Sequence, residues 1–245
     1  PEVSKERRSC SKGGKKMIIT KQKPFEVIKE YLRDNKKVFI VGCGECATLC
    51  KTGGPDEIAE MAQMLRDAGK EVTGSFVAIA PCNIVGTKIE MKKLGEPVKE
   101  ADAVIVLSCG AGVGSIAETY EDKNVIPGCD SLFLGNTIRV GSYDERCMTC
   151  GECILEETGG ICPVTTCAKG LLNGPCGGMN NGKCEISPDI ECAWVRIYRR
   201  LEKKGKLDRM EKIHEAKDYS KHTKPGVFEG EKYAKMRKRP EGGKR

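Results

Sequence analysis

The chain has 245 residues, enough for one domain with a substantial core and a second, smaller unit. Its formal net charge of +7 comes from its ends: residues 1–23 carry +6 and residues 196–245 carry +10, which leaves −9 on residues 24–195. This acidic middle, with one Trp and five Phe in the whole chain, argues against a nucleic-acid-binding protein, and no apolar run approaches the ~20 residues of a membrane span.

Cysteine is abundant, with 15 residues. A secreted disulfide framework is not expected, because the chain is long for such a scaffold and no apolar segment with a cleavage site precedes the cysteines. Cysteines in C-x-x-C clusters are more often metal ligands in a reducing compartment. We therefore expect a cytoplasmic protein that binds metal through thiolates.

The first part of the chain alternates between helical and strand patterns. Residues 1–16 have no apolar periodicity and are expected to form a disordered extension. Apolar spacing then predicts a helix over residues 24–32, a buried strand over residues 37–41 and an amphipathic helix over residues 55–68, which Gly69 is placed to end. Further strands are predicted at residues 74–80, 103–107 and 125–126, and further helices near residues 89–94 and 113–120.

Strands that alternate with helices predict an α/β fold, a small parallel Rossmann-like sheet domain over residues 17–143. Binding sites in such sheets gather at the carboxyl ends of the strands. Three of the predicted strands end in a cysteine, at Cys43, Cys82 and Cys109. Cys43 also opens a C-x2-C-x3-C motif with Cys46 and Cys50, which provides three thiolates for an iron–sulfur cluster.

A cubane cluster at this motif needs a fourth thiolate. Cys109 is preferred because its glycine-rich surroundings let the chain wrap closely, and Cys82 is the alternative. Cys129 is expected to act as a small buried hydrophobe. A redox-active disulfide between Cys43 and Cys46 is a further alternative, which the nearby third cysteine disfavours.

Residues 144–190 are predicted to form a cysteine-rich, loop-dominated metal domain. Together with Cys192 of the next segment, eight cysteines occur here, at Cys147, Cys150, Cys153, Cys162, Cys167, Cys176, Cys184 and Cys192. The opening C-x2-C-x2-C is the spacing that places three thiolates around an iron–sulfur cube, and a proline follows Cys162 as in ferredoxin motifs. The gap before Cys162 is longer than in ferredoxins, so the motif is a variant.

Eight cysteines suffice for two four-thiolate sites. By analogy with two-cluster ferredoxins, we expect one site from Cys147, Cys150, Cys153 and Cys192, and the other from Cys162, Cys167, Cys176 and Cys184. Spacing does not fix this connectivity. Iron is favoured at the first site, whereas the broader spacing at the second leaves zinc open.

The C-terminal part begins with a predicted helical region over residues 191–216. An amphipathic helix is expected to pack on the cysteine-rich domain through Ile190, Ala193, Trp194, Ile197 and Leu201. His214 and His222 are expected at the surface and not as ligands. Residues 217–245 are polar and basic and are expected to form a flexible arm.

From Cys147 onward the sequence reads CMTCGECILEETGGICPVTTCAKGLLNGPCGGMNNGKCE, followed by ECAWVRIYRRLEKKGKLD. It resembles the C-terminal domain associated with methylenetetrahydrofolate reductases. The upstream segments VGCGECATLCKTGG and VLSCGAGVGSIAE extend the resemblance over most of residues 17–210. The chain is thus similar to the MetV-type iron–sulfur subunits of the MetVF-type reductase.

The resemblance implies a subunit that is not catalytic on its own. It would carry two or three [4Fe-4S] clusters, or one zinc ion in place of a cluster in the C-terminal region. It would pass electrons to the FAD or FMN of a MetF-type methylenetetrahydrofolate reductase subunit in the one-carbon chemistry of the Wood–Ljungdahl (acetyl-CoA) pathway. Reduced ferredoxin or a flavin-based bifurcating complex would be the electron donor, with no nucleic-acid or membrane partner.

The residues themselves are consistent with an electron carrier that has no catalytic centre of its own. No dinucleotide-binding glycine fingerprint is complete, and no constellation of carboxylates or histidines stands out as a catalytic centre. The alternative is a zinc-stabilised scaffold subunit of the same complex without a redox role.

Overall fold

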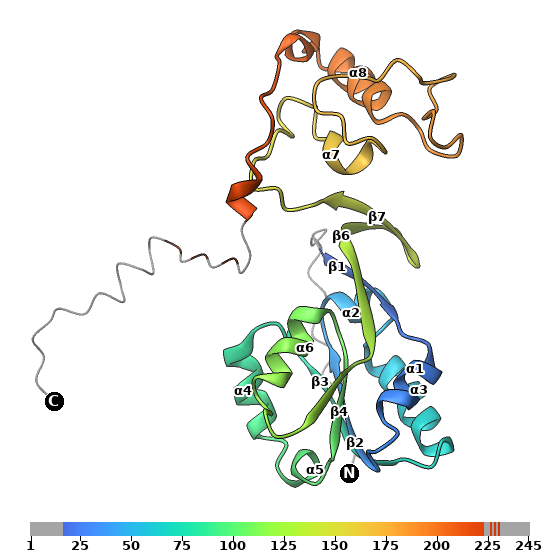
Figure 1. The fold of residues 1–245 in the computed structure, drawn as a ribbon, viewed down its shortest axis with the longest axis vertical. Coiled ribbons are helices and arrows are strands. Elements are labelled where there is room, and N and C mark those ends of the chain that lie inside the picture. Colours follow the sequence, from blue (N-terminus) through green and yellow to red (C-terminus); the bar gives the residue numbers. More distant parts are fainter. Residues whose placement is uncertain (1–16, 223–225, 227, 229, 231–245) are drawn as a thin grey trace, which may run out of the picture. The chain divides into compact units, whose positions relative to one another are not determined.

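The computed structural model describes residues 17–222, 226, 228 and 230. The chain divides into two compact units, Pro1–Cys147 and Met148–Arg245 (Figure 1). The expected extension over residues 1–16 and most of the expected arm over residues 217–245 lie outside the described residues. Within the described part of the chain, no helix is long and apolar enough to cross a bilayer.

The first unit contains the predicted parallel sheet. Its strands are β2 (Lys37–Cys43), β3 (Glu71–Ala78), β4 (Ala103–Leu107) and β5 (Asn124–Pro127), in the order β3-β2-β4-β5. The sequence predicted β4 with its observed bounds, but β3 begins three residues earlier than expected. Glu71 and Thr73 are polar and β3 lies at an edge of the sheet, where partial exposure weakens the apolar signal.

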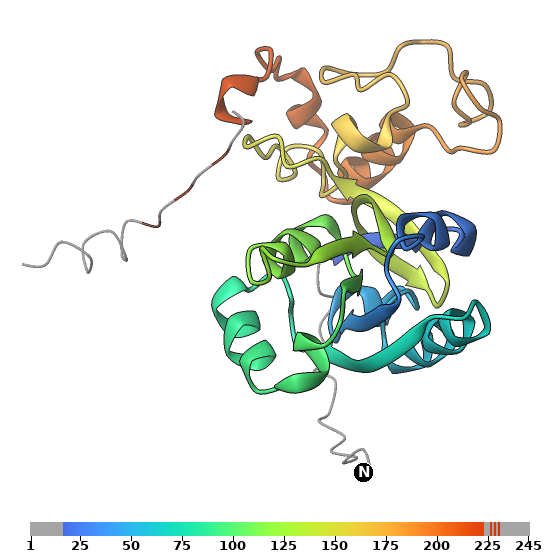
Figure 2. The ribbon, with the colours of Figure 1, turned by 60° about the horizontal axis from the view of Figure 1, so that its bottom comes forward.

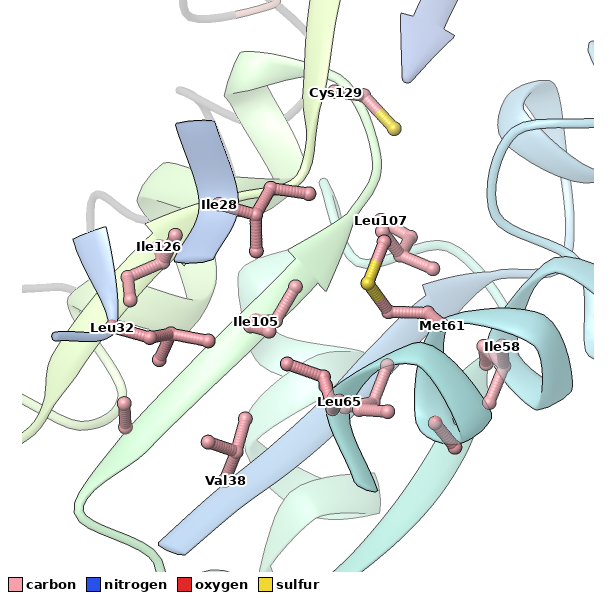
Figure 3. Close-up of a cluster of buried hydrophobic side chains, with 13 residues drawn as sticks. Ile28, Leu32, Val38, Ile58, Met61, Leu65, Ile105, Leu107, Ile126 and Cys129 are labelled. Atoms are coloured by element: carbon pink, nitrogen blue, oxygen red, sulfur yellow. The ribbon is translucent and has the colours of Figure 1, made fainter. Parts of the chain in front are cut away.

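The two central strands are buried on both faces. Val38 and Ile40 of β2 join one apolar cluster, whereas Phe39 and Val41 join the other, and β4 alternates in the same way. Helices α1 (Phe25–Tyr31) and α3 (Pro55–Asp67) cover the first face, which Figure 3 shows in close-up. The second face is covered by α4 (Ile84–Lys92), α5 (Glu96–Lys99) and α6 (Gly110–Ala117) (Figure 1).

Helix boundaries follow local capping chemistry. Helix α3 ends as predicted, with Gly69 just beyond it in the left-handed region at φ +79°. Helix α4 begins five residues earlier than expected, because Asn83 caps it by accepting a hydrogen bond from the Gly86 amide at 3.2 Å. Helix α6 begins at Gly110, directly after Cys109, and not at residue 113 as expected.

A second sheet in this unit corrects the expectation of a purely parallel domain. Strands β1 (Met17–Gln22), β6 (Cys129–Arg139) and β7 (Ser142–Cys147) form an antiparallel sheet in the order β1-β6-β7. The fold is therefore mixed α/β. The pairing of β1 with β6 joins residues more than a hundred positions apart, and β6 is mostly exposed, so neither strand carries a strong local signal.

The second unit is dominated by loops, as expected (Figure 2, yellow to orange). Its described elements are α7 (Pro163–Thr166), α8 (Ala193–Lys203) and the 3-10 turns η1 (Leu207–Glu211) and η2 (Tyr219–His222).

Helix α8 carries the predicted apolar stripe. It packs Trp194, Ile197 and Leu201 against Ile161, and the Trp194 indole N–H donates to the Leu171 carbonyl oxygen at 3.1 Å. Ala193 is also buried. Ile190 was expected on the stripe but precedes the helix and is 46% exposed.

Replacing Gly53 by alanine should destabilise the first unit by about 1–3 kcal/mol, because a Cβ there would lie 1.9 Å from the Leu107 carbonyl oxygen. Gly114→Ala is the matched control: this exposed position in α6 has no atom within 4 Å of an added Cβ, so alanine should be neutral or stabilising by up to ~1 kcal/mol. Denaturant unfolding of both variants under reducing conditions measures the difference. Equal stabilities would contradict the close approach at Gly53.

Candidate metal centres

The first group of cysteines lies at the carboxyl edge of the parallel sheet. Cys43 is the last residue of β2, Cys82 follows β3, and Cys109 follows β4. The chain runs from β2 to β3 on one side and returns to β4 on the other, so β2 and β4 flank the point where the strand order reverses. Open α/β sheets bind their ligands in the crevice at this point. Cys43 and Cys109 are therefore where such a fold places a site.

The loop after β2 is held tightly against this edge. The Cys43 amide donates to the Gly53 carbonyl oxygen at 2.9 Å, and the Thr48 hydroxyl donates to the Cys43 carbonyl oxygen at 2.6 Å. The short helix α2 (Cys46–Leu49) lies within the loop and carries Cys46 at its start. The loop thus holds two motif cysteines on ordered backbone.

Cys46 and Cys109 lie close enough to Cys43 and Cys82 to affect the pKa of those two thiols. Burial raises the pKa of the Cys43 thiol, and nearby Cys46 and Cys109 raise it further. Burial also raises the pKa of the Cys82 thiol, with further increases from Cys109 and Cys46. Both candidates for the fourth ligand, Cys109 and Cys82, are therefore neighbours of the motif.

The third motif cysteine faces the antiparallel sheet. Cys50 is 6% exposed and packs against Met17 and Ile19 of β1, and its Sγ lies 3.8 Å from the Ile18 carbonyl oxygen. Burial raises the pKa of its thiol, and nearby Cys46 raises it further. The edge thus offers five thiols, one more than a cubane cluster needs.

Cys129 belongs to the core, as the sequence predicted. It packs in the apolar cluster between the sheet and helices α1 and α3 (Figure 3), and its Sγ donates to the Thr52 carbonyl oxygen at 3.5 Å. Burial raises the pKa of its thiol to about 12.

The C-x2-C-x2-C motif spans the division of the chain into its two units. Cys147 is the last residue of β7, and Cys150 and Cys153 follow in the second unit. The Cys150 Sγ lies 3.4 Å from the Glu152 carbonyl oxygen, and Cys153 is exposed. Cys162 is half-buried and caps the start of α7.

The remaining four cysteines of the second unit share one cavity. This cavity of about 20 Å³ lies beside the start of α8. Its lining includes Cys167, Cys176, Cys184 and Cys192. The sequence predicts Cys192 with the C-x2-C-x2-C motif and Cys162 with this group, whereas the structure lines the cavity with Cys192 and not with Cys162.

The segment after α8 folds back on residues 152–157, which corrects the expectation of a surface His214. The His214 side chain is 13% exposed, and its Nε2 lies 2.9 Å from a carboxylate oxygen of Glu157. A hydrogen bond from Lys212 lowers the pKa of Glu157, and His214 lowers it further. The sequence offered a signal for this contact, because the acidic pair at 156–157 is opposite in charge to the basic residues of 206–217.

The donor chemistry of these residues fits thiolate-bound metal. The 14 cysteines in the described part of the chain are all free thiols. Among the described residues, however, no group of three or more His, Cys, Asp or Glu side chains is gathered closely enough to hold a metal ion as it stands.

The Cys129 thiol should resist alkylation in the folded protein. A pKa of about 12 leaves roughly one thiol in 10,000 ionised at pH 8, and the thiolate is the reactive form. Iodoacetamide treatment of reduced, metal-free protein at pH 8, mapped by mass spectrometry, should modify the exposed Cys176 and leave Cys129 unmodified. Unfolding in urea should make the two equally reactive. Rapid labelling of Cys129 in the folded protein would contradict its burial.

Residues 126–220 match the family model described as methylene-tetrahydrofolate reductase C terminal. The matched segment begins within β5 and contains the eight cysteines from Cys147 to Cys192 together with helix α8. No curated protein and no solved structure matches the chain.

Proposed function

We propose, on the premise that residues 126–220 belong to the methylene-tetrahydrofolate reductase C-terminal family, that the chain is an electron-transfer subunit of a methylenetetrahydrofolate reductase. The family match carries this proposal, because it covers the eight-cysteine segment that would hold redox centres. The chain would be non-catalytic on its own. Its partner would be a MetF-type subunit whose FAD or FMN receives the electrons, and ferredoxin or a bifurcating complex would supply them.

The first proposed [4Fe-4S] site lies at the edge of the parallel sheet. Cys43, Cys46 and Cys109 are its proposed ligands, and the grouping is supported by the effect of nearby Cys46 and Cys109 in raising the pKa of the Cys43 thiol. The fourth proposed ligand is Cys50, the third cysteine of the motif, since Cys46 packs against the apolar cluster that contains Cys50. Cys82, which follows β3, is the alternative.

The second proposed [4Fe-4S] site uses the C-x2-C-x2-C motif. Cys147, Cys150 and Cys153 have the spacing of cluster ligands, and Cys162-Pro163 resembles the end of a ferredoxin motif. A bound cluster supplies a one-electron carrier at each site. The contribution of the chain is to bury and orient the thiolates, and hydrogen bonds to sulfur, such as those from loop amides, adjust the potential.

A zinc-stabilised scaffold subunit is the second candidate function. The observation in its favour is the small cavity lined by four cysteines, since four thiolates also satisfy a structural zinc site. In that case the chain would position the reductase without carrying electrons.

Protein purified anaerobically should be brown, contain about eight irons with matching sulfide, and lose its visible absorbance when dithionite is added. Adding the reduced protein to a MetF-type subunit should reduce the flavin of that subunit. Replacing Cys46 by serine should remove about four irons, because it deletes a ligand of the first site. Cys129→Ser is the matched control and should retain full iron content, since Cys129 belongs to the core.

A colourless, iron-free protein with zinc would reject electron transfer in favour of the scaffold. Full iron content in the Cys46→Ser variant would reject the proposed ligands of the first site.

A further inference from the structure

We propose that Cys167, Cys176, Cys184 and Cys192 bind a single tetrahedral metal ion of the zinc class, and that this ion fastens the loops of the second unit to the start of helix α8. The inference refines the proposed function in one region. It requires that these cysteines be metal ligands, and it does not require that the chain carry electrons.

The size of the cavity favours a single ion. Its volume of about 20 Å³ is close to the space that holds one water molecule. Four thiolates around zinc need room only for the ion, at Zn–S distances of about 2.3 Å. The four side chains are among the described residues that do not yet surround one point, so binding of the ion would draw them together.

Backbone pairing brings two of the four cysteines together. Lys183 and Glu191 form an antiparallel bridge, flanked by hydrogen bonds of 2.9 Å from the Cys184 amide to the Ile190 carbonyl oxygen and from the Cys192 amide to the Gly182 carbonyl oxygen. Side chains alternate across such a ladder, so Cys184 and Cys192 lie on the same face, opposite to that of the bridging pair. They are diagonal neighbours, although seven residues separate them in sequence.

The charge of the surroundings suits a thiolate site. Cys192 is the N-cap of the 11-residue helix α8, and the unpaired amides at a helix N-terminus stabilise negative charge. Lys169 also lines the cavity, where it pairs with Glu185. Glu185 and Glu191 also line the cavity, so Lys169 is already paired there and the N-terminus of α8 is the feature that favours thiolates.

A metal ion here would link segments that share little secondary structure. Cys167 follows α7, Cys176 lies in the loop beyond it, and Cys184 and Cys192 belong to the bridged segment before α8. Cys167 and Cys192 pack against the apolar cluster of Trp194, Ile197 and Leu201. The ion would therefore connect the loops to the apolar face of α8.

Assigning these four cysteines to one ion also leaves a complete set of four ligands for the proposed iron–sulfur site of the C-x2-C-x2-C motif. It leaves Cys147, Cys150, Cys153 and Cys162, a C-x2-C-x2-C-x8-C run followed by proline, as four thiols for the iron–sulfur site. No cysteine is shared between the two sets.

The test is the zinc and iron content of the full chain, purified anaerobically, with serine at Cys176 or at Cys184. The wild-type chain should contain about one zinc, and each variant should lose it while retaining all of its iron. Cys129→Ser is the control and should retain both metals. Retention of zinc by both variants would overturn the assignment, and so would loss of about four irons, because that result would indicate a cube.

A second measurement does not depend on the folding of variants. Trp194 is the single tryptophan of the chain and lines the cavity, so cobalt that replaces zinc should quench its fluorescence and give the absorption of tetrahedral thiolate-bound cobalt. Cobalt-loaded protein that lacks both signals would overturn the proposal. Zinc without iron would reject the electron-transfer function and support this metal site. Iron without zinc would support the electron-transfer function and reject this metal site.

Discussion

The first unit depends on the burial of its two central strands from both sides. Because β2 and β4 alternate their apolar side chains between the two helix layers, each strand is fixed in position and in register. Gly42 of β2 pairs with Leu107 of β4, so the residues that follow both strands emerge side by side. The geometry of the candidate site is therefore a consequence of core packing, and the cysteines need no special backbone to reach it.

The second unit has a different physical basis. Its apolar cluster consists of four buried residues, of which three belong to α8, and the rest of the unit is mostly loop. Ion pairs between residues 156–157 and 209–214 add contacts, but exposed pairs contribute little to stability. A loop-rich unit with so small a core commonly depends on metal ligation or cross-links, and its seven cysteines are the residues available for that role.

Much of this arrangement could be predicted from local patterns. The buried run Ala103–Leu107 and the amphipathic helix Pro55–Asp67 have strong periodicity, and both occur nearly as predicted. Knowing that parallel strands share a carboxyl edge was enough to bring Cys43, Cys82 and Cys109 together. Strands β1 and β6 were missed because their pairing is non-local, and because β6 is mostly exposed. The position of Cys192 was also missed, because the bridge that places it near Cys184 is a tertiary feature that spacing does not encode.

The close approach of Gly53 to the end of β4 has a consequence for nucleotides. In dinucleotide-binding sheets the crevice between the central strands stays open, and a glycine-rich turn lets the pyrophosphate approach a helix N-terminus. Here the loop after β2 occupies that space, since the backbone of Gly53 lies against the Leu107 carbonyl group. Any ligand of this crevice must therefore fit beside the Gly53 loop, or the loop must move away from Leu107 to admit a nucleotide.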